Sequence, residues 1–539
     1  MQDAPLTIDS ILRRGEKLYP AQEIATRTAT GIEHQTFADL AVESRKVAGM
    51  MDVLGVSPDG RVASFAWNTF RHTALYFGVP SAGRVLHTAN IRYFPDQLVY
   101  TFDHAEDEVV FVDRSLLGIL GPQLPSLTTL KHIVVMDDGA PTPLPDDSRV
   151  VLYSDLLAQA SEVELDGRVT DEHAAAAICY TSGTTGNPKG VLYSHRSTYL
   201  HAMAGLTTTS FGVNASDRVV PIVPMFHAMG WGLPYAAVMG GAALLMPGPD
   251  LSPAGLLSLI ESERATFAAG VPTIWMGMLP LIDGHDLSWM QPMAGGSAVP
   301  RSLSEAWRAK TGRPIIQGWG MTEMSPLGSF GYSRPEVLAM PEEEQADIRA
   351  LAGFPPPGME LRIVDAVTRE EVPWDGESTG ELEARGPWVA KQYFRTDEPG
   401  DAFSSDGWLR TGDVAAITPL GYLKIVDRTK DLVKSGGEWI SSVDLENLIM
   451  GNPKVKEAAV IAMPHPKWDE RPLACVVVKE GEELTKDELL GWIADRVGKW
   501  QVPDDVVFID EVPKTSVGKF SKKTLRDQFT AEGYTLPTA

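Results

Sequence analysis

The chain has 539 residues, of which 44% are hydrophobic and 22% are charged, and this composition excludes a disordered or fibrous protein. At about 150 residues per domain, this length predicts several structural units with enough apolar side chains for a large core. The formal net charge of −24 opposes extended binding to nucleic acid, although a local basic pocket for a single nucleotide is compatible with it.

Short apolar runs alternate with longer helical patterns through most of the chain. Residues 37–56 have the pattern of a helix, and strands are predicted from the runs RVASFAW, EVVFVD, HIVVMDD and RVVPIVP. This alternation predicts an α/β fold with at least partly parallel sheets.

The stretch YTSGTTGNPKGVLYSHR follows a short apolar run and precedes another. We therefore expect its loop to join two strands, with Ser194 capping a following helix. Glycines, hydroxyls and Lys189 suit a phosphate, but an ordinary surface turn has the same composition. The spacing departs from the P-loop template, whose second glycine would fall on Pro188 and whose hydroxyl would fall on Gly190, so the usual P-loop kinase or ATPase is excluded.

The C-terminal part of the chain has a pattern of its own. EAAVIAMP and LACVVVKEG predict strands, and LTKDELLGWIADRVGKW predicts a helix whose Thr485 and Glu488 have capping-box spacing. We expect a small α+β domain that begins between Arg428 and Lys434, which divides the chain into residues 1–429 and 430–539.

The two cysteines, Cys179 and Cys475, have no neighbours at metal-binding spacing, which favours a reducing compartment and, for Cys179, buried packing. The N-terminus lacks the basic start and apolar core of a secretory signal. No stretch reaches the roughly 18 apolar residues that a membrane helix needs. We therefore expect a cytoplasmic protein without an integral membrane segment.

The motif YTSGTTGNPKGV resembles the phosphate-binding signature of adenylate-forming enzymes, the superfamily of acyl-CoA synthetases, nonribosomal adenylation domains and beetle luciferases. Five further segments resemble its later motifs in the same order: AGGSAVP, QGWGMTEMSP, WLRTGD, DRTKDLVKSGGEWISSVDLE and PKTSVGK. Each alone is compatible with a turn, a helix cap or a solvated lysine. Together they identify the chain as a member, and the resemblance implies a large N-terminal domain of several subdomains with mixed sheets and a small, mobile α+β C-terminal domain.

The resemblance also implies a site for ATP and Mg²⁺. Lys519, Thr322 and Glu323 are implied to catalyse attack of a carboxylate on the α-phosphate of ATP, and Thr181 and Glu323 to hold the metal. Asp413 is implied to accept hydrogen bonds from the ribose hydroxyls. The implied ATP-binding positions are Thr181, Ser182, Gly183, Thr184, Thr185, Gly186, Lys189, Gly296, Ser297, Ala298, Gln317, Gly318, Trp319, Gly320, Met321, Thr322, Asp413 and Arg428.

A second reaction, with CoA, is implied by the segment DRTKDLVKSGGEWISS. In the resembling enzymes the small domain swings about a hinge, which withdraws the catalytic lysine and brings a glycine-rich loop to the acyl-adenylate. By motif position the hinge is Lys430, with Asp431 beside it, and the CoA passage comprises Lys434, Gly436, Gly437 and Trp439.

The segment IVPMFHAMGWGLPYAA gives the best clue to the acid. His227 and Trp231 match an aromatic-histidine element and an acyl-tunnel gate of fatty-acyl-CoA synthetases, and His227 is counted with the catalytic positions; packing in the core is the alternative for both side chains. Gly296, Gly320 and Met321 complete the expected acyl pocket.

These motifs place the chain near fatty-acyl-CoA synthetases and ligases for short acids such as 3-methylmercaptopropionate. We expect an acyl-CoA ligase that uses ATP, Mg²⁺ and CoA to activate a short- to medium-chain carboxylic acid, with release of AMP and pyrophosphate; longer and thioether-containing acids stay open as substrates. Analogy implies a homodimer. The alternatives are an enzyme that transfers the acyl group to a separate carrier protein and an adenylate-binding protein without turnover.

Overall fold

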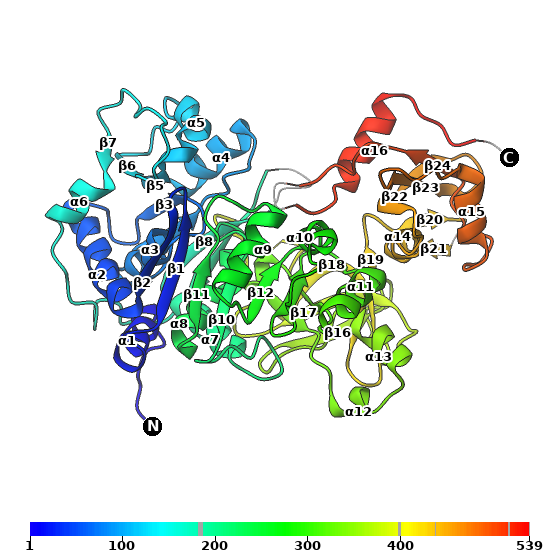
Figure 1. Ribbon diagram of the computed structural model, residues 1–539, viewed down its shortest axis with the longest axis horizontal. Helices are drawn as coiled ribbons and strands as arrows, with labels where there is room; N and C mark the ends of the chain where they lie inside the picture. The colour runs from blue at the N-terminus through cyan, green and yellow to red at the C-terminus, as the bar shows by residue number, and fades with distance from the viewer. Residues whose placement is uncertain (182–186, 397–399, 437, 516–517, 538–539) are drawn as a thin grey trace.

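The structure is a computed structural model that describes residues 1–181, 187–396, 400–436, 438–515 and 518–537. The strands of these residues form four sheets. Two large sheets and a smaller one form the N-terminal bulk of the molecule, and the fourth lies with its helices on one side of it, coloured orange to red in Figure 1.

One large sheet has the strand order β7-β6-β5-β3-β4-β8-β9. Its neighbouring strands are parallel except for β8 and β9, which are antiparallel and carry the loop of the first motif between them. Its strands are β3 (Arg61–Phe65), β4 (Val85–Thr88), β5 (Asp107–Asp113), β6 (His132–Met136), β7 (Val150–Leu152), β8 (Ala175–Tyr180) and β9 (Gly190–Ser194).

The other large sheet has the order β15-β14-β13-β12-β10-β11-β1-β2. Its outermost pairs are antiparallel and its inner pairs are parallel, so both large sheets are mixed, as the sequence predicted. Its strands are β1 (Glu23–Thr28), β2 (Gly31–Thr36), β10 (Arg218–Pro221), β11 (Ala243–Met246), β12 (Phe267–Gly270), β13 (Gln291–Gly295), β14 (Ile316–Gly320) and β15 (Leu327–Phe330).

Helices cover the large sheets on both faces. In β5, Val109 and Phe111 belong to the core between the two sheets, whereas Val110 and Val112 belong to the core on the outer face. Burial on both faces explains why these strands read as continuous apolar runs. The helices of the shared core are α1 (Ile8–Leu18), α2 (Phe37–Val53), α3 (Phe70–Ser81), α6 (Tyr153–Gln159), α7 (His195–Gly205) and α8 (Leu233–Gly240).

The outer faces have helices of their own. Those of the seven-stranded sheet are α4 (Pro95–Ala105) and α5 (Leu117–Leu120), and those of the eight-stranded sheet are α9 (Pro253–Ser262), α10 (Pro272–Met278) and α11 (Arg301–Thr311). Two shorter helices, α12 (Pro335–Leu338) and α13 (Glu342–Arg349), follow β15.

The remaining two sheets follow in the chain. The first is antiparallel, with β16 (Glu360–Val364), β17 (Gly380–Arg385), β18 (Leu409–Ile417) and β19 (Leu423–Arg428). The second contains β20 (Val433–Ser435), β21 (Glu438–Ile440), β22 (Val455–His465), β23 (Asp469–Val478) and β24 (Asp505–Phe508). Helices α14 (Ser442–Met450) and α15 (Lys486–Ala494) cover one face of this last sheet, and α16 (Lys522–Ala531) covers the other.

Several local predictions are confirmed. The side chain of Ser194 accepts a hydrogen bond from the N–H of Ser197 and caps α7. Thr485 caps α15 in the same way, but the carboxylate of Glu488 bonds Lys454 instead of returning to Thr485, so only half of the predicted capping box forms. Both cysteines are buried. Within the described ranges, no helix is both long enough and apolar enough to cross a membrane.

Candidate active site

A main cavity of about 410 Å³ lies where the two large sheets, the antiparallel sheet and the C-terminal segment meet. It collects side chains from motifs that are up to 338 positions apart in the chain, from residue 181 to residue 519. The predicted residues that line it are Thr181, Lys189, His227, Trp231, Gly296, Gly318, Trp319, Gly320, Met321, Thr322, Glu323, Arg428, Lys430 and Lys519.

A second cavity of about 270 Å³ adjoins the first, and the two share Trp319, Arg428 and Lys519 among their lining residues. The predicted residues that line only this cavity are Ser297, Ala298, Gln317, Asp413 and Asp431.

The predicted CoA-passage residues lie elsewhere. Lys434, Gly436 and Trp439 line neither cavity and belong to the β20–β21 hairpin, where the indole of Trp439 is half exposed and Lys434 lies over it. Other predicted positions are outside the described residues, namely Ser182, Gly183, Thr184, Thr185, Gly186 and Gly437.

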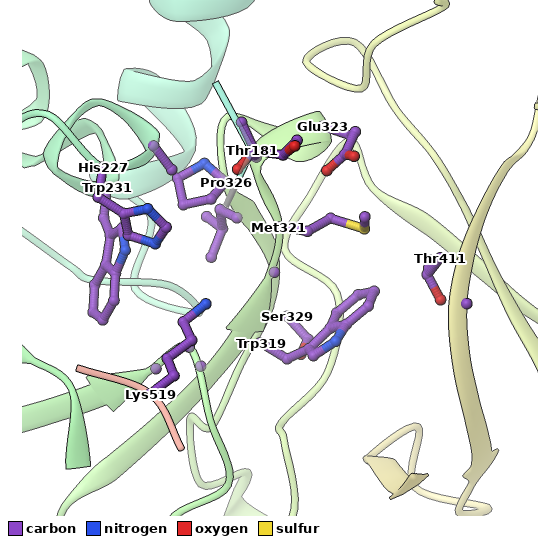
Figure 2. Close-up of a pocket in the computed structure, with 18 of the residues that line it drawn as sticks. Thr181, His227, Trp231, Trp319, Met321, Glu323, Pro326, Ser329, Thr411 and Lys519 are labelled. Carbon is purple, nitrogen blue, oxygen red and sulfur yellow. The ribbon is translucent and has the colours of Figure 1, made fainter. Parts of the chain in front are cut away.

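Lys519 reaches the main cavity from the C-terminal part of the chain. The carbonyl of Gly518 accepts a hydrogen bond from the Thr273 hydroxyl, and the Lys519 side chain lies along the backbone of Gly296. A Cβ atom at Gly296, whose φ is +86°, would be 2.7 Å from Lys519 Cε, so only glycine leaves this path open. Figure 2 shows the lysine amine pointing into the cavity.

The environment of the Lys519 amine lowers its pKa to about 8. Burial is the main cause, because desolvation disfavours the charged form, and the positive charge of Arg428 adds to it. Asp413 and Glu323 act in the opposite direction. The amine therefore carries a proton at neutral pH and loses it in the mildly alkaline range.

Glu323 and Thr181 lie together at one end of the cavity, opposite Lys519 (Figure 2). The buried carboxylate of Glu323 accepts a hydrogen bond of 2.6 Å from the hydroxyl of Tyr393. The hydroxyl of Thr181 accepts a bond from the N–H of Lys189, and its oxygen retains a second lone pair. A carboxylate and a hydroxyl are the hard oxygen ligands that Mg²⁺ prefers, so the two predicted metal ligands fit this ion.

Asp413 is held between two donors at the wall of the second cavity. Its carboxylate accepts a hydrogen bond of 2.8 Å from Trp319 Nε1 and lies 3.2 Å from Arg428 Nε. Burial raises the pKa of Asp413, and the charge of Arg428 opposes this rise. The contacts orient the carboxylate that the sequence assigned to the ribose.

His227 and Trp231 stand side by side on another wall of the cavity (Figure 2). His227 precedes an uncommon backbone turn, η3 (Ala228–Gly232), and Trp231 lies within it; the five consecutive φ angles of this turn are positive, between 36° and 71°. A left-handed conformation costs an L-residue roughly 1–2 kcal/mol, so packing must stabilise this turn. Burial and the charge of Lys519 lower the pKa of His227 to about 3, so its imidazole is neutral at physiological pH.

Several lining residues were not predicted. Arg410 and Thr411 lie within the motif WLRTGD, and Thr429 lies within the segment that begins DRTKD, so membership of a motif was an available signal for all three. Phe211 and Tyr393 had no such signal, because they lie between the motifs in stretches without distinctive composition.

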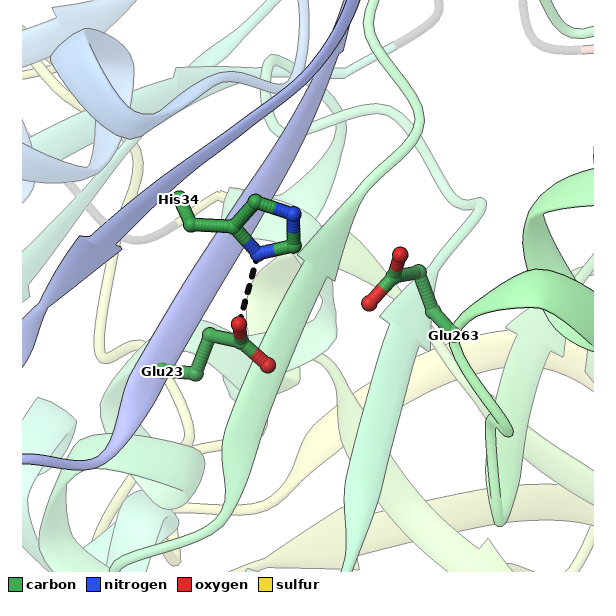
Figure 3. A group of neighbouring side chains, drawn as sticks. All are labelled: Glu23, His34 and Glu263. Carbon is green, nitrogen blue, oxygen red and sulfur yellow. Dashed lines mark hydrogen bonds and ion pairs between the residues drawn. The ribbon is translucent and has the colours of Figure 1, made fainter.

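Among the described residues, Glu23, His34 and Glu263 also form a group with metal-ligand chemistry, away from both cavities (Figure 3). His34 Nδ1 lies 2.6 Å from a carboxylate oxygen of Glu23. The guanidinium of Arg218 lies 2.8 Å from Glu23 and 2.7 Å from Glu263. Because the guanidinium of Arg218 already pairs with both carboxylates, we assign this group to a surface ion-pair cluster and not to a metal site.

Comparison with known families gives two matches that together span most of the chain. The family model described as "AMP-binding enzyme" matches residues 14–394, and the model described as "AMP-binding enzyme C-terminal domain" matches residues 444–519.

Three similar proteins are bacterial CoA ligases. A 3-methylmercaptopropionyl-CoA ligase of Ruegeria pomeroyi is 44% identical over 534 residues, which cover 98% of both chains. A long-chain-fatty-acid–CoA ligase of Thermus thermophilus is 43% identical over 98% of this chain and 96% of its own. A medium-chain-fatty-acid–CoA ligase of Ectopseudomonas oleovorans is 41% identical over 97% of this chain and 96% of its own.

Solved structures have the same fold over almost the whole chain. An anthranilate CoA ligase in complex with anthranoyl-AMP superposes with a TM-score of 0.87 at 25% identity, covering 99% of this chain and 100% of its own. ATP-bound MatB from Rhodopseudomonas palustris superposes with a TM-score of 0.82 at 26% identity, covering 98% and 100%.

Proposed function

The chain belongs to the family of AMP-binding enzymes, and from this premise we propose that it is an AMP-forming acyl-CoA ligase for a short- to medium-chain aliphatic acid. One observation carries the proposal: a single cavity contains a lysine amine, oxygen ligands for a metal, and an apolar wall. The amine of Lys519 and the Glu323–Thr181 pair provide the polar groups, and Trp231 contributes to the apolar wall.

In the first half-reaction the carboxylate of the acid attacks the α-phosphorus of ATP. A bond forms between the carboxylate oxygen and phosphorus, and the bond to the β-phosphate oxygen breaks, so that pyrophosphate leaves with the electron pair. Two anions approach each other in this step. The ammonium group of Lys519 would donate hydrogen bonds to the α-phosphate, and its positive charge would stabilise the negative charge that builds up there.

Asp413 would accept hydrogen bonds from the ribose, and Gly296 to Ala298 would lie beside adenine. Trp319 and Arg428 contact different oxygens of the Asp413 carboxylate and so keep it oriented before ATP enters. The hydroxyl of Thr181 and the carboxylate of Glu323 would hold Mg²⁺, which supplies positive charge that stabilises the phosphate oxygens.

In the second half-reaction the thiol of CoA attacks the acyl carbonyl, the carbon–oxygen bond to AMP breaks, and the thiol proton passes to solvent. We place the division between the two domains at 429/430, where the chain leaves β19 and enters the last sheet. A rotation about Lys430 and Asp431 would withdraw Lys519 and bring Lys434, Gly436, Gly437 and Trp439 towards the cavity. The position of this hairpin away from both cavities supports an arrangement suited to the first half-reaction.

The function is tested with a panel of aliphatic and thioether acids, ATP and Mg²⁺, with either CoA or a carrier protein as the thiol. We expect AMP, pyrophosphate and an acyl-CoA thioester in equal amounts. If no acid gives AMP, the proposal is wrong, and this result favours an adenylate-binding protein. If the thioester forms only on the carrier protein, the second half-reaction is transfer of the acyl group to a carrier protein and not to CoA.

Replacing Trp231 with alanine is expected to change the acid preference. Loss of the indole enlarges the cavity at its apolar wall. In a pocket of this kind, one methylene group changes the discrimination between two acids by roughly 10- to 200-fold. The ratio of kcat/KM between a longer and a shorter acid should therefore move by about tenfold or more in favour of the longer acid. The KM for ATP should stay nearly constant. The control is Trp374→Ala, which removes a half-exposed indole outside both cavities. If the acid preference of Trp231→Ala equals that of the wild type, Trp231 has only a packing role.

The rate of adenylation is expected to fall as the pH rises through about 8. Only the protonated amine of Lys519 is positive, and its pKa of about 8 makes this form dominant below that pH. The kcat/KM for ATP, which reports the free enzyme, should show this loss. Lys519→Arg keeps its charge throughout the range and should flatten the alkaline limb, even if its overall rate is lower. An alkaline limb that persists unchanged in Lys519→Arg would assign the titration to another group.

We also propose a homodimer, by analogy with related fatty-acyl-CoA synthetases. Light scattering on the purified protein should give twice the mass of one chain. A monomer mass at micromolar concentration would contradict this part of the proposal and leave the ligase function unaffected.

A further inference from the structure

Residues 388–395, which we name the bridging segment, connect two walls of the active site that are far apart in sequence. At its start the indole of Trp388 donates a hydrogen bond to the carbonyl of Leu327, and the N–H of Ala390 donates to the carbonyl of Glu323. At its end the N–H of Phe394 donates to the carbonyl of Gly190, at the base of the phosphate-binding loop. The bridging segment therefore fixes the loop base relative to the turn that carries Glu323.

Tyr393 lies within the bridging segment and contacts both walls with one side chain. Its hydroxyl donates a hydrogen bond of 2.6 Å to Oε1 of Glu323. The ammonium of Lys189 lies over its ring, 4.6 Å from the centroid. Within the described residues, the other oxygen of Glu323, Oε2, accepts no hydrogen bond and is left for a ligand.

The chemistry of these two contacts differs. The hydroxyl contact is a hydrogen bond to a buried carboxylate, which is roughly twice as strong as a neutral one and restricts how the carboxylate turns. The Tyr393 hydroxyl is the donor in this contact, because an ionised carboxylate can only accept. The ring contact is a cation–π interaction, which restrains the long side chain of Lys189 without using the hydroxyl.

We propose that Tyr393 is a positioning residue for the first half-reaction, whose hydroxyl orients Glu323 toward the metal and whose ring restrains the ammonium group of Lys189. The inference rests on the proposed ligase function, because it assigns Glu323 to Mg²⁺ and Lys189 to the loop that binds phosphate. It predicts that the two contacts of one side chain can be separated by substitution.

Tyr393→Phe removes the hydroxyl and keeps the ring. We expect the half-saturating Mg²⁺ concentration for acyl-adenylate formation to rise about tenfold, because the substitution removes one hydrogen bond to a charged group. The KM for ATP at saturating Mg²⁺ should change little, and thioester formation from supplied acyl-adenylate should be unchanged. Tyr422→Phe, which removes a buried hydroxyl that bonds Tyr332 outside both cavities, is the matched control and should leave the Mg²⁺ dependence unchanged.

Tyr393→Leu removes the ring as well and is expected to raise the KM for ATP roughly two- to fivefold, in addition to the Mg²⁺ effect. Lys189→Met should raise the KM for ATP in the wild type and in Tyr393→Phe, and should add much less in Tyr393→Leu. In Glu323→Gln, the further change Tyr393→Phe should no longer affect the Mg²⁺ dependence.

The affinity of the protein for Mn²⁺, measured in the presence of a non-hydrolysable ATP analogue, tests the same inference without turnover. Tyr393→Phe should weaken this affinity about tenfold, while its midpoint of thermal unfolding matches that of Tyr422→Phe. An unchanged metal affinity in a folded Tyr393→Phe protein, or equal loss of both half-reactions, overturns the inference. Failure of the wild type to form any acyl-adenylate is a different result, which contradicts the proposed function and leaves the metal-affinity comparison to decide the role of Tyr393.

Discussion

Replacing Lys519 with alanine is expected to reduce acyl-adenylate formation roughly 100- to 1,000-fold, the loss that follows removal of one preorganised donor to a developing negative charge. The amine enters the cavity along Gly296. Arg428 and Lys430 also line the described part of the cavity, but they come from a different segment of the chain. Neither can follow the same path, so the lost charge should not be replaced.

The second half-reaction separates a catalytic role of Lys519 from a structural one. When acyl-adenylate is supplied directly, Lys519→Ala should form thioester at close to the wild-type rate, because attack by a thiol on the acyl carbon does not require the amine. Pyrophosphate exchange measures the first step and thioester absorbance the second. Lys456→Ala, an exposed lysine on β22 outside both cavities, is the control and should match the wild type in both assays. Equal losses in the two half-reactions would refute the assignment of Lys519 to adenylation alone.

The second large effect is expected at Gly232, in the left-handed turn at the wall of the main cavity. Its φ is +71°, and a Cβ atom there would be 2.4 Å from Nδ1 of the buried His201. Gly232→Ala combines a left-handed alanine, at roughly 1–2 kcal/mol, with overpacking at roughly 1–3 kcal/mol. We therefore expect the free energy of unfolding to fall by about 2–5 kcal/mol, measured from urea-induced unfolding followed by tryptophan fluorescence.

A matched glycine isolates the cost of packing from the cost of the backbone. Gly284 has a φ of +88° with no atom within 4 Å of the Cβ position, so Gly284→Ala should lose only the backbone contribution, about 1–2 kcal/mol. His201 also faces the N–H of Leu327, a residue of the cavity wall, at 3.4 Å. A folded Gly232→Ala protein should therefore show an altered acid preference as well. If the two substitutions destabilise equally, the contact with His201 has no energetic role.

Much of the fold was accessible from local sequence patterns. The apolar runs that predicted β3, β5, β6 and β10 lie in strands, and the helix predicted from residue 37 begins at Phe37. Two strands flank the first motif, and Ser194 caps the helix that follows. These features depend on side chains a few positions apart, so the periodicity of burial and the capping chemistry are visible in a single segment.

The order of the strands could not be predicted in this way. The N-terminal strand β1 pairs with β11, about 220 positions later in the chain, whereas β3 to β9 form a different sheet between them. Pairing of distant parallel strands depends on which helices pack between the sheets, and no local pattern contains that information.

For the active site, the sequence by itself determined the family, since the residue types and the order of the motifs identify adenylate-forming enzymes, and it predicted which motifs carry the chemistry. Only the tertiary structure decided which of these residues meet. It brings Lys519 against Gly296 and Tyr393 against Glu323, and it leaves Lys434, Gly436 and Trp439 outside the two cavities. The left-handed backbone of Ala228–Gly232 was equally inaccessible to the sequence, because five positive φ angles in a row become stable only when the surrounding core excludes the alternatives.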